Sequence, residues 1–283
     1  MSRRRTVKRR SQRSQRSQKT WVPHLPGGES AQCHPRLRNK TRRGRECLPS
    51  AMRSKLGSVS GCAEGDELCM VRKSHISSEE KERITKEYFR PEMPTEWKND
   101  DDMWLSNEDI DNVMKQYEEA YPHFKFLGVT PIDFSAPNIY GDKSKCLKDQ
   151  FCHVNLEEER KKGKTLIGAI FNLDHHLKNG SHWVAAALDL KRGANYYFDS
   201  YGMPPPPQIS RFIRSFKIQN PHVKLQQNGR RFQYGNSECG VYSMYFLIRM
   251  IAGDSFRTFV RRPISDKDIH EFRKQLYSMS PAS

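Results

Sequence analysis

Long apolar runs are missing from this 283-residue sequence, and acidic residues are scarce in its first 60 positions. Apolar residues make up only 35% of the chain, which is low for a protein that packs along its whole length. No stretch of about 18 consecutive apolar residues occurs, so we expect no membrane-spanning helix. Because Ser2-Arg3-Arg4-Arg5 stands where an apolar leader would lie, we expect no signal peptide either.

Acidic residues are nearly absent from residues 1–60, where 17 lysines and arginines face only Glu29 and Glu46. The other 223 residues hold 32 basic and 31 acidic side chains, so the net charge of +16 belongs almost entirely to the first segment. A Ser-Gln-Arg repeat starts at residue 11 within it. We therefore predict a disordered basic arm over residues 1–60. It either binds nucleic acid or another polyanion, or is a solvated extension without a specific partner.

The cysteines follow no metal-binding pattern, because their number is odd and their spacings are irregular. Cys62 and Cys69, with His75 beyond them, fit no zinc-ligand spacing. We therefore expect free thiols in a reducing intracellular compartment, and neither a metal nor a cofactor. The seven residues are Cys33, Cys47, Cys62, Cys69, Cys146, Cys152 and Cys239.

Apolar spacing divides the rest of the chain into a short helical extension, residues 61–100, and a packed domain, residues 101–283. A charged run at 78–84 predicts a helix in the extension. The packed domain opens with helical spacing from Trp104 to Tyr117, for which Ser106 is a suitable N-cap. A strand is predicted at 124–129, and the charged residues 140–163 indicate a surface insertion.

The second half of the chain is rich in strand signals. Apolar runs predict strands at 166–173, 183–188 and 196–198, and a further strand begins at 223. Helices are predicted at 209–216, from Cys239 onward, and at 266–277, where Ser265 and Asp268 form a capping pair. This order indicates an α+β fold with a mixed central sheet flanked by helices.

His182 and Asp199 are a candidate base and its orienting carboxylate. His182 enters one predicted strand from a polar turn, and Asp199 ends the next strand. Adjacent antiparallel strands bring these two ends together. Asp189 is an alternative acid, but it lies seven residues along the same strand, at about 3.3 Å per residue, and is therefore too far away. His175 and His176 are adjacent loop histidines, for which surface positions are the favoured reading over a metal site.

Cys239 is a candidate nucleophile, because it precedes Gly240 at the start of a predicted amphipathic helix. The positive end of a helix dipole favours the thiolate, and a nearby imidazolium would favour it further. A buried structural cysteine is the alternative interpretation. Gln233, six residues earlier, carries an amide that can donate to an oxyanion together with backbone N–H groups.

These motifs occur in one order: His182-Trp183, then Phe198-Asp199-Ser200, then Gln233, then Cys239-Gly240. In this order they resemble the ubiquitin-like-protein-processing cysteine proteases, the clan of the SUMO and adenovirus proteases. The segments 181–185, 197–200, 237–243 and 264–273 are similar to the polyprotein proteases of the African swine fever virus type. The resemblance runs from about residue 100 to 279 and extends weakly back to 62–76.

The resemblance implies a papain-like cysteine protease fold of the ubiquitin-like protease type. It implies catalytic roles for His182, Asp199 and Cys239 and an oxyanion-binding role for Gln233. Trp104 and Trp183 match tryptophans that could roof a tunnel for a Gly-Gly pair; a core position is the alternative for Trp104. The sequence departs from the swine fever type at Asp199, where that type carries Asn and the wider clan more often carries Asp.

The expected function is that of a cysteine endopeptidase that cleaves protein substrates after Gly-Gly. The resemblance implies a late protein of a large DNA virus that matures capsid or core polyproteins, in the host cytoplasm (viral factories) and in the virion. Alternatives are a protease that removes ubiquitin-like modifiers from host conjugates, an acyltransferase of the same clan, and a nucleic-acid-binding structural protein that uses the basic arm. The pair Gly27-Gly28 lies in a segment expected to be disordered and raises the hypothesis of self-cleavage after Gly28; the alternative is that the pair is incidental.

Overall fold

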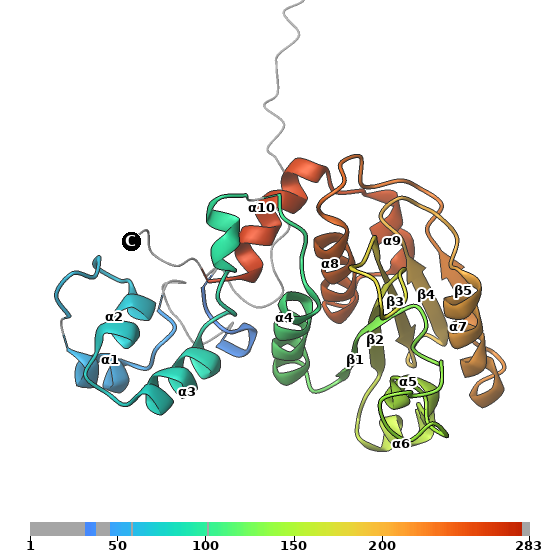
Figure 1. Ribbon diagram of the computed structural model, residues 1–283, viewed down its shortest axis with the longest axis horizontal. Coiled ribbons are helices and arrows are strands. Elements are labelled where there is room, and N and C mark those ends of the chain that lie inside the picture. The colour runs from blue at the N-terminus through green and yellow to red at the C-terminus, as the bar shows by residue number, and fades with distance from the viewer. Residues whose placement is uncertain (1–31, 38–45, 58, 101, 279–283) are drawn as a thin grey trace, which may run out of the picture.

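The computed structural model describes residues 32–37, 46–57, 59–100 and 102–278 (Figure 1). The predicted Gly27-Gly28 cleavage site and most of the predicted arm lie outside these residues. The helices of the N-terminal part are the 3₁₀ helices η1 (Pro35–Leu37) and η2 (Thr95–Lys98) and the α-helices α1 (Ser50–Leu56), α2 (Glu67–Lys73) and α3 (Ser78–Tyr88). None of the helices among the described residues is long and apolar enough to cross a membrane.

A five-stranded mixed sheet lies at the centre of the protein, in the order β1-β2-β3-β4-β5. The middle strands run antiparallel, whereas β1 pairs with β2 and β5 pairs with β4 in parallel. The predicted strand block is therefore confirmed, and its first and last strands form the parallel edges. The strands are β1 (Phe124–Pro131), β2 (Leu166–Asn172), β3 (Trp183–Asp189), β4 (Ala194–Phe198) and β5 (Lys224–Gln227).

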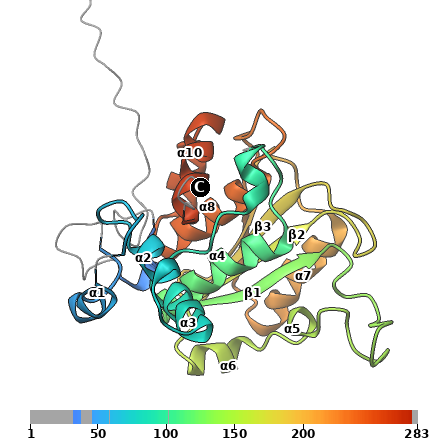
Figure 2. The same ribbon diagram turned by 60° about the vertical axis from the view of Figure 1, so that its left-hand side comes forward.

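Helices cover both faces of the sheet (Figures 1 and 2). One face packs against α4 (Asn107–Ala120) and α8 (Cys239–Ile251), with α9 (Phe256–Arg261) and α10 (Asp266–Leu276) completing that core. The other face packs against α5 (Asp149–Cys152), α6 (Leu156–Lys161) and α7 (Pro207–Gln219). Every residue of β3 is buried, and alternate residues enter the two cores, as a strand covered on both sides requires.

Two predicted helix starts are confirmed by their caps. Ser106 accepts a hydrogen bond from the backbone N–H of Asp109, whose carboxylate in turn accepts from the backbone N–H of Ser106. Ser265 accepts from the backbone N–H of Asp268 at the start of α10. These short-range bonds fix where α4 and α10 begin.

Part of the predicted disordered arm is folded. Cys33, Cys47 and Leu48 are buried in a third apolar cluster with residues of α2 and α3. Glu67, at the start of α2, accepts hydrogen bonds from the backbone N–H groups of Cys47 and Leu48. The prediction of disorder is therefore wrong for these residues, although the division of the chain at residues 60 and 100 remains a prediction.

The expectation of free thiols is wrong for six of the seven cysteines. Disulfides join Cys33 to Cys47, Cys62 to Cys69, and Cys146 to Cys152. Their Cα atoms lie 5.1, 5.7 and 6.5 Å apart, within the range that a disulfide spans. Spacing along the chain cannot reveal such proximity. Cys239 is the one cysteine that stays free.

Candidate active site

His182 and Asp199 are neighbours at one end of the antiparallel pair β3–β4. His182 immediately precedes β3, and Asp199 immediately follows β4. Because the two strands are antiparallel and Ala185 lies opposite Phe198, the start of β3 is beside the end of β4. The Nε2 atom of His182 lies 2.7 Å from Oδ1 of Asp199. A carboxylate only accepts hydrogen bonds, so Nε2 carries a hydrogen and Nδ1 is left to face another group.

Asp199 is held in place both at its carboxylate and at its backbone. Its Oδ1 also accepts a hydrogen bond of 2.8 Å from the backbone N–H of Tyr201. The amide of Asn228 accepts from the backbone N–H of Asp199 at 3.0 Å and donates to its carbonyl at 2.6 Å. Asp199 and Asn228 are both only 1% exposed, so this arrangement is shielded from water.

Three contacts set the orientation and charge of His182. The ring of Tyr201 stacks on the imidazole with centroids 4.6 Å apart. Burial lowers the pKa of His182, but hydrogen bonds to Asp199 and to Cys239, together with their negative charges, outweigh burial and raise the pKa to about 9. The imidazole is therefore charged at neutral pH while it is paired with these two groups.

Cys239 is the first residue of α8 and is 2% exposed. Close packing surrounds the next residue: a Cβ on Gly240 would lie 3.0 Å from Leu105 and 3.2 Å from Trp183. A side chain at position 240 would therefore push these residues away, which explains why glycine follows the thiol. Cys239 thus lies at the N-terminus of α8 and within hydrogen-bonding reach of the His182 imidazole.

Gln233 lies in the loop before α8 and is 1% exposed. Its Oε1 accepts a hydrogen bond of 2.7 Å from the hydroxyl of Ser200, which fixes the direction of the amide. Its Nε2 is buried and has no hydrogen-bond partner among the described residues. A buried donor without a partner is costly, so a site that keeps one is suited to an incoming acceptor such as an oxyanion.

The two tryptophans singled out in the sequence differ in burial. Trp183 is 4% exposed and belongs to the core beneath α8, whereas Trp104 is 44% exposed. The core alternative for Trp104 is therefore wrong, and its indole is available to a ligand. No bound chain is present, so the tunnel itself stays a prediction.

The other residues weighed in the sequence lie away from this arrangement. Asp189 ends β3 and pairs with Arg192, so the expected separation from His182 is found. His175 and His176 both approach Asp133, at 3.5 and 2.6 Å. Both histidines thus have a partner within the protein, and neither lies near Cys239 in the sequence or takes part in the contacts described above for His182.

One set of potential metal ligands was not noticed in the sequence. Ligand atoms of Asp102, Glu238 and His270 all lie within 4.8 Å of one another. Glu238, however, already forms an ion pair with Arg273 at 3.2 Å and contacts His270 at 2.9 Å. Both contacts are made to Oε1, and Oε2 has no hydrogen-bond partner among the described residues. We assign no metal to this set of residues.

Sequence reasoning missed Tyr201, Asn228 and Ser200, which orient the residues that it found. Ser200 and Tyr201 directly follow Asp199, so their neighbourhood was an available signal. Asn228 is 29 residues from Asp199, and no spacing rule points to it.

The comparisons with known proteins match this geometry. Residues 134–281 match the family model of the Ulp1 protease family, C-terminal catalytic domain. The chain is 30% identical over 246 residues to protein R355 of Acanthamoeba polyphaga mimivirus, named as a thiol protease; the match covers 83% of this chain and 75% of R355. It is 26% identical over 187 residues to the SUMO-1 cysteine protease S273R of African swine fever virus, covering 62% and 68% of the two chains.

The crystal structure of the African swine fever virus pS273R protease has a similar fold. It superposes with a TM-score of 0.70 over 90% of this chain and 98% of that one, at 20% sequence identity. Fold, family and relatives together define the protein as a cysteine protease. The chain belongs to the Ulp1 protease family, as the resemblance noted in the sequence implied.

Proposed function

We propose that Cys239 is the nucleophile of this protease, that His182 is its base and that Asp199 orients the base. The observation that carries the assignment is the chain of contacts from Asp199 through His182 to the only cysteine not held in a disulfide. In the first step His182 holds the thiol proton, and the Cys239 sulfur forms a bond to the substrate carbonyl carbon. Gln233 Nε2 donates to the oxygen that becomes negative.

The second half of the reaction returns the enzyme to its starting state. The C–N bond breaks as the His182 imidazolium gives its proton to the leaving amine. Water, deprotonated by His182, then attacks the thioester, and the carboxylic acid product leaves Cys239 with its proton restored. The reaction needs no group other than these side chains and water.

The proposed substrate is a protein chain cut after a Gly-Gly pair. The resemblance to the polyprotein proteases supports this choice, as does the crowding of Leu105 and Trp183 around Gly240 beside the nucleophile. Residues without side chains pass through a narrow approach most easily. Maturation of viral capsid or core polyproteins, in the host cytoplasm and in the virion, is the proposed role. Removal of a ubiquitin-like modifier is the second candidate, because the relative S273R is named as a SUMO-1 cysteine protease.

A direct test compares two substrate classes on wild-type protein and on single variants. Cys239→Ser and His182→Ala should abolish cleavage of Gly-Gly-X peptides, whereas Asp199→Ala should lose less, because a solvent molecule can partly orient the imidazole. Circular dichroism and thermal melting check that each variant is folded. Wild-type turnover in Cys239→Ser would contradict the nucleophile assignment. Faster cleavage of SUMO or ubiquitin precursors than of the peptides would favour the second candidate.

We further propose that the basic N-terminal residues bind a polyanion, because nearly all of the excess positive charge lies there. Deleting residues 1–28 removes nine lysines and arginines and leaves Cys33 and its packed neighbours in place. The deletion should weaken binding to DNA, RNA and heparin and lower its salt dependence, with peptide cleavage retained. Equal affinity in the shortened chain would place the polyanion site after residue 28.

A further inference from the structure

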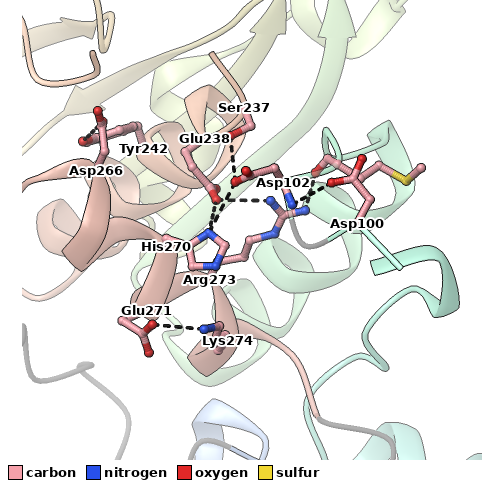
Figure 3. Close-up of polar contacts among 11 residues, drawn as sticks. Asp100, Asp102, Ser237, Glu238, Tyr242, Asp266, His270, Glu271, Arg273 and Lys274 are labelled. Carbon is pink, nitrogen blue, oxygen red and sulfur yellow. Dashed lines mark hydrogen bonds and ion pairs between the residues drawn. The ribbon is translucent and has the colours of Figure 1, made fainter. Parts of the chain in front are cut away.

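The residue before the nucleophile, Glu238, is a buried acid. It is 5% exposed and precedes Cys239 at the start of α8. Its Oε1 accepts a hydrogen bond of 3.2 Å from Nη1 of Arg273 and lies 2.9 Å from Nδ1 of His270 (Figure 3). Both partners come from α10, so this carboxylate ties the start of α8 to the last long helix of the chain.

Arg273 extends the connection to a third part of the chain. It is only 2% exposed, and its Nη2 donates to the backbone carbonyl of Met103. Its guanidinium also lies over the ring of Trp97, 3.9 Å from the centroid. The guanidinium of Arg273 thus donates to Glu238 from one nitrogen and to the Met103 carbonyl from another. A planar guanidinium can make both bonds at once, whereas the single ammonium group of a lysine does so less well.

The Met103–Leu105 segment lies beside the nucleophile. Met103 is held by Arg273, and Leu105 is buried, 3.0 Å from the position of a Cβ on Gly240. Trp104 stands between these two fixed residues, and its side chain is 44% exposed. The backbone on both sides of this exposed indole is therefore anchored, one side through Arg273 and the other through the core next to Gly240.

We propose that Arg273 and Glu238 are positioning residues that hold Trp104 against the path of the substrate. The proposal rests on the proposed function, because it assumes that a peptide chain approaches Cys239 along Trp104. In the free enzyme the anchored segment already has the conformation that binds substrate. Without the link, substrate binding has to order this segment, and the apparent affinity falls accordingly.

The test uses Arg273→Lys in the full chain. Lysine keeps a positive charge for Glu238 but cannot hold Glu238 and the Met103 carbonyl together. We expect KM for a Gly-Gly-X peptide to rise about tenfold, the scale of losing one charged hydrogen bond, with kcat nearly unchanged. The rate at which iodoacetamide alkylates Cys239 should also stay unchanged, because this small reagent does not have to bind along Trp104 to reach the thiol.

Two further variants make the result specific. Glu238→Gln keeps the shape of the side chain, weakens the hold on Arg273 and should raise KM in the same direction. Lys274→Gln is the matched control, because Lys274 lies next to Arg273 on α10 but pairs with Glu271 at the surface. It should leave KM, kcat and alkylation at wild-type values.

Amide hydrogen exchange reports on the link without any substrate. In Arg273→Lys and Glu238→Gln, exchange at residues 103–106 should become faster, while β3 keeps its protection. Wild-type KM together with wild-type exchange at 103–106 in both variants would overturn the proposal. A lower kcat and slower alkylation with unchanged KM would also overturn the proposal, because that pattern would mean that Arg273 and Glu238 act on Cys239 and not on Trp104. A wild-type protein that cleaves no Gly-Gly peptide contradicts the proposed function instead, and the exchange experiment still decides whether the link exists.

Discussion

The side chains of His182 and Gln233 are each fixed by a hydrogen bond at one atom and leave a second polar atom for another group. Asp199 is fixed by Tyr201 and Asn228 and leaves Nδ1 of His182 for the thiol. Gln233 is fixed through its oxygen and leaves Nε2 for a ligand. Fixing one end of each side chain before substrate arrives lowers the cost of orienting it during the reaction.

Gln233→Ala tests the open amide. Loss of one oxyanion donor should lower kcat by roughly two to three decades, with little change in KM, because the donor acts when negative charge develops. Steady-state kinetics on a Gly-Gly-X peptide measures both constants. The control is Ser200→Ala, which removes only the group that orients the amide and should cost less. A change confined to KM would make Gln233 a residue that binds the ground state.

The charge of His182 should depend on Cys239. Cys239→Ala removes the hydrogen bond and the negative charge that help to raise the pKa of His182, so this pKa should fall below about 9. Two-dimensional NMR of the imidazole resonances during a pH titration measures the change. An unaltered pKa in Cys239→Ala would show that the two side chains do not interact.

The same pair should make stability depend on pH. The folded-state pKa of His182 is raised from 6.5 to about 9, so the charged imidazole stabilises the folded protein. This contribution to the free energy of unfolding is complete below about pH 6.5 and is lost as the pH rises through about 9. Urea unfolding of wild type and Cys239→Ala across this range should show the difference between them shrinking toward high pH.

At the scale of elements, the close approach of α8 to the sheet places the thiol. Small residues, Gly168 in β2 with Ala185 and Ala187 in β3, face the core that contains α8. A Cβ on Gly168 would lie 2.9 Å from Phe124 and 3.1 Å from Leu247 of α8. The helix therefore lies as near to β2 as these side chains permit, and its first residue comes within reach of His182.

Gly168→Ala should lower the free energy of unfolding by about 1–3 kcal/mol, because the added methyl overpacks the contact between β1, β2 and α8. Gly229→Ala is the matched control: a Cβ there would meet no atom within 4 Å. Urea denaturation of both variants checks the prediction. If the two lose equal stability, packing at Gly168 is not the constraint that holds α8 in place.

At the scale of the whole molecule, the excess positive charge and the proposed catalytic residues lie in different parts of the chain. The basic residues concentrate before residue 60, and the proposed catalytic groups lie between residues 182 and 239. Gly27-Gly28 lies between the most basic stretch and Cys33, the first cysteine of the packed N-terminal cluster. A cut there would remove positive charge and leave every disulfide intact.

We expect wild-type protein to cut a second copy of itself after Gly28 during long incubation at high concentration. Mass spectrometry should find a new N-terminus at Glu29 in the wild type and none in Cys239→Ser. The Gly28→Val variant is the control for the site, since a branched side chain should block the cut. Intact wild-type protein under conditions where Gly-Gly peptides are cleaved would reject self-cleavage and leave the proposed protease function standing.

Local patterns in the sequence were sufficient for most elements, and they named residues that the structure brings together at the candidate site. Apolar runs predicted the strands that became β2, β3 and β4, and the caps at Ser106 and Ser265 marked two helix starts. The order of His182, Asp199, Gln233 and Cys239 identified the family. These signals are readable because each depends on residues a few positions apart or on one motif at a time.

Only the tertiary structure decided which distant residues meet. It paired six cysteines that spacing had suggested were free, and it folded part of the predicted arm against α2 and α3. It also brought Arg273 to Glu238 and to Met103, 35 and 170 residues away along the chain. Such contacts leave no period and no fixed spacing in the sequence, because they depend on how elements pack in three dimensions and not on local conformation.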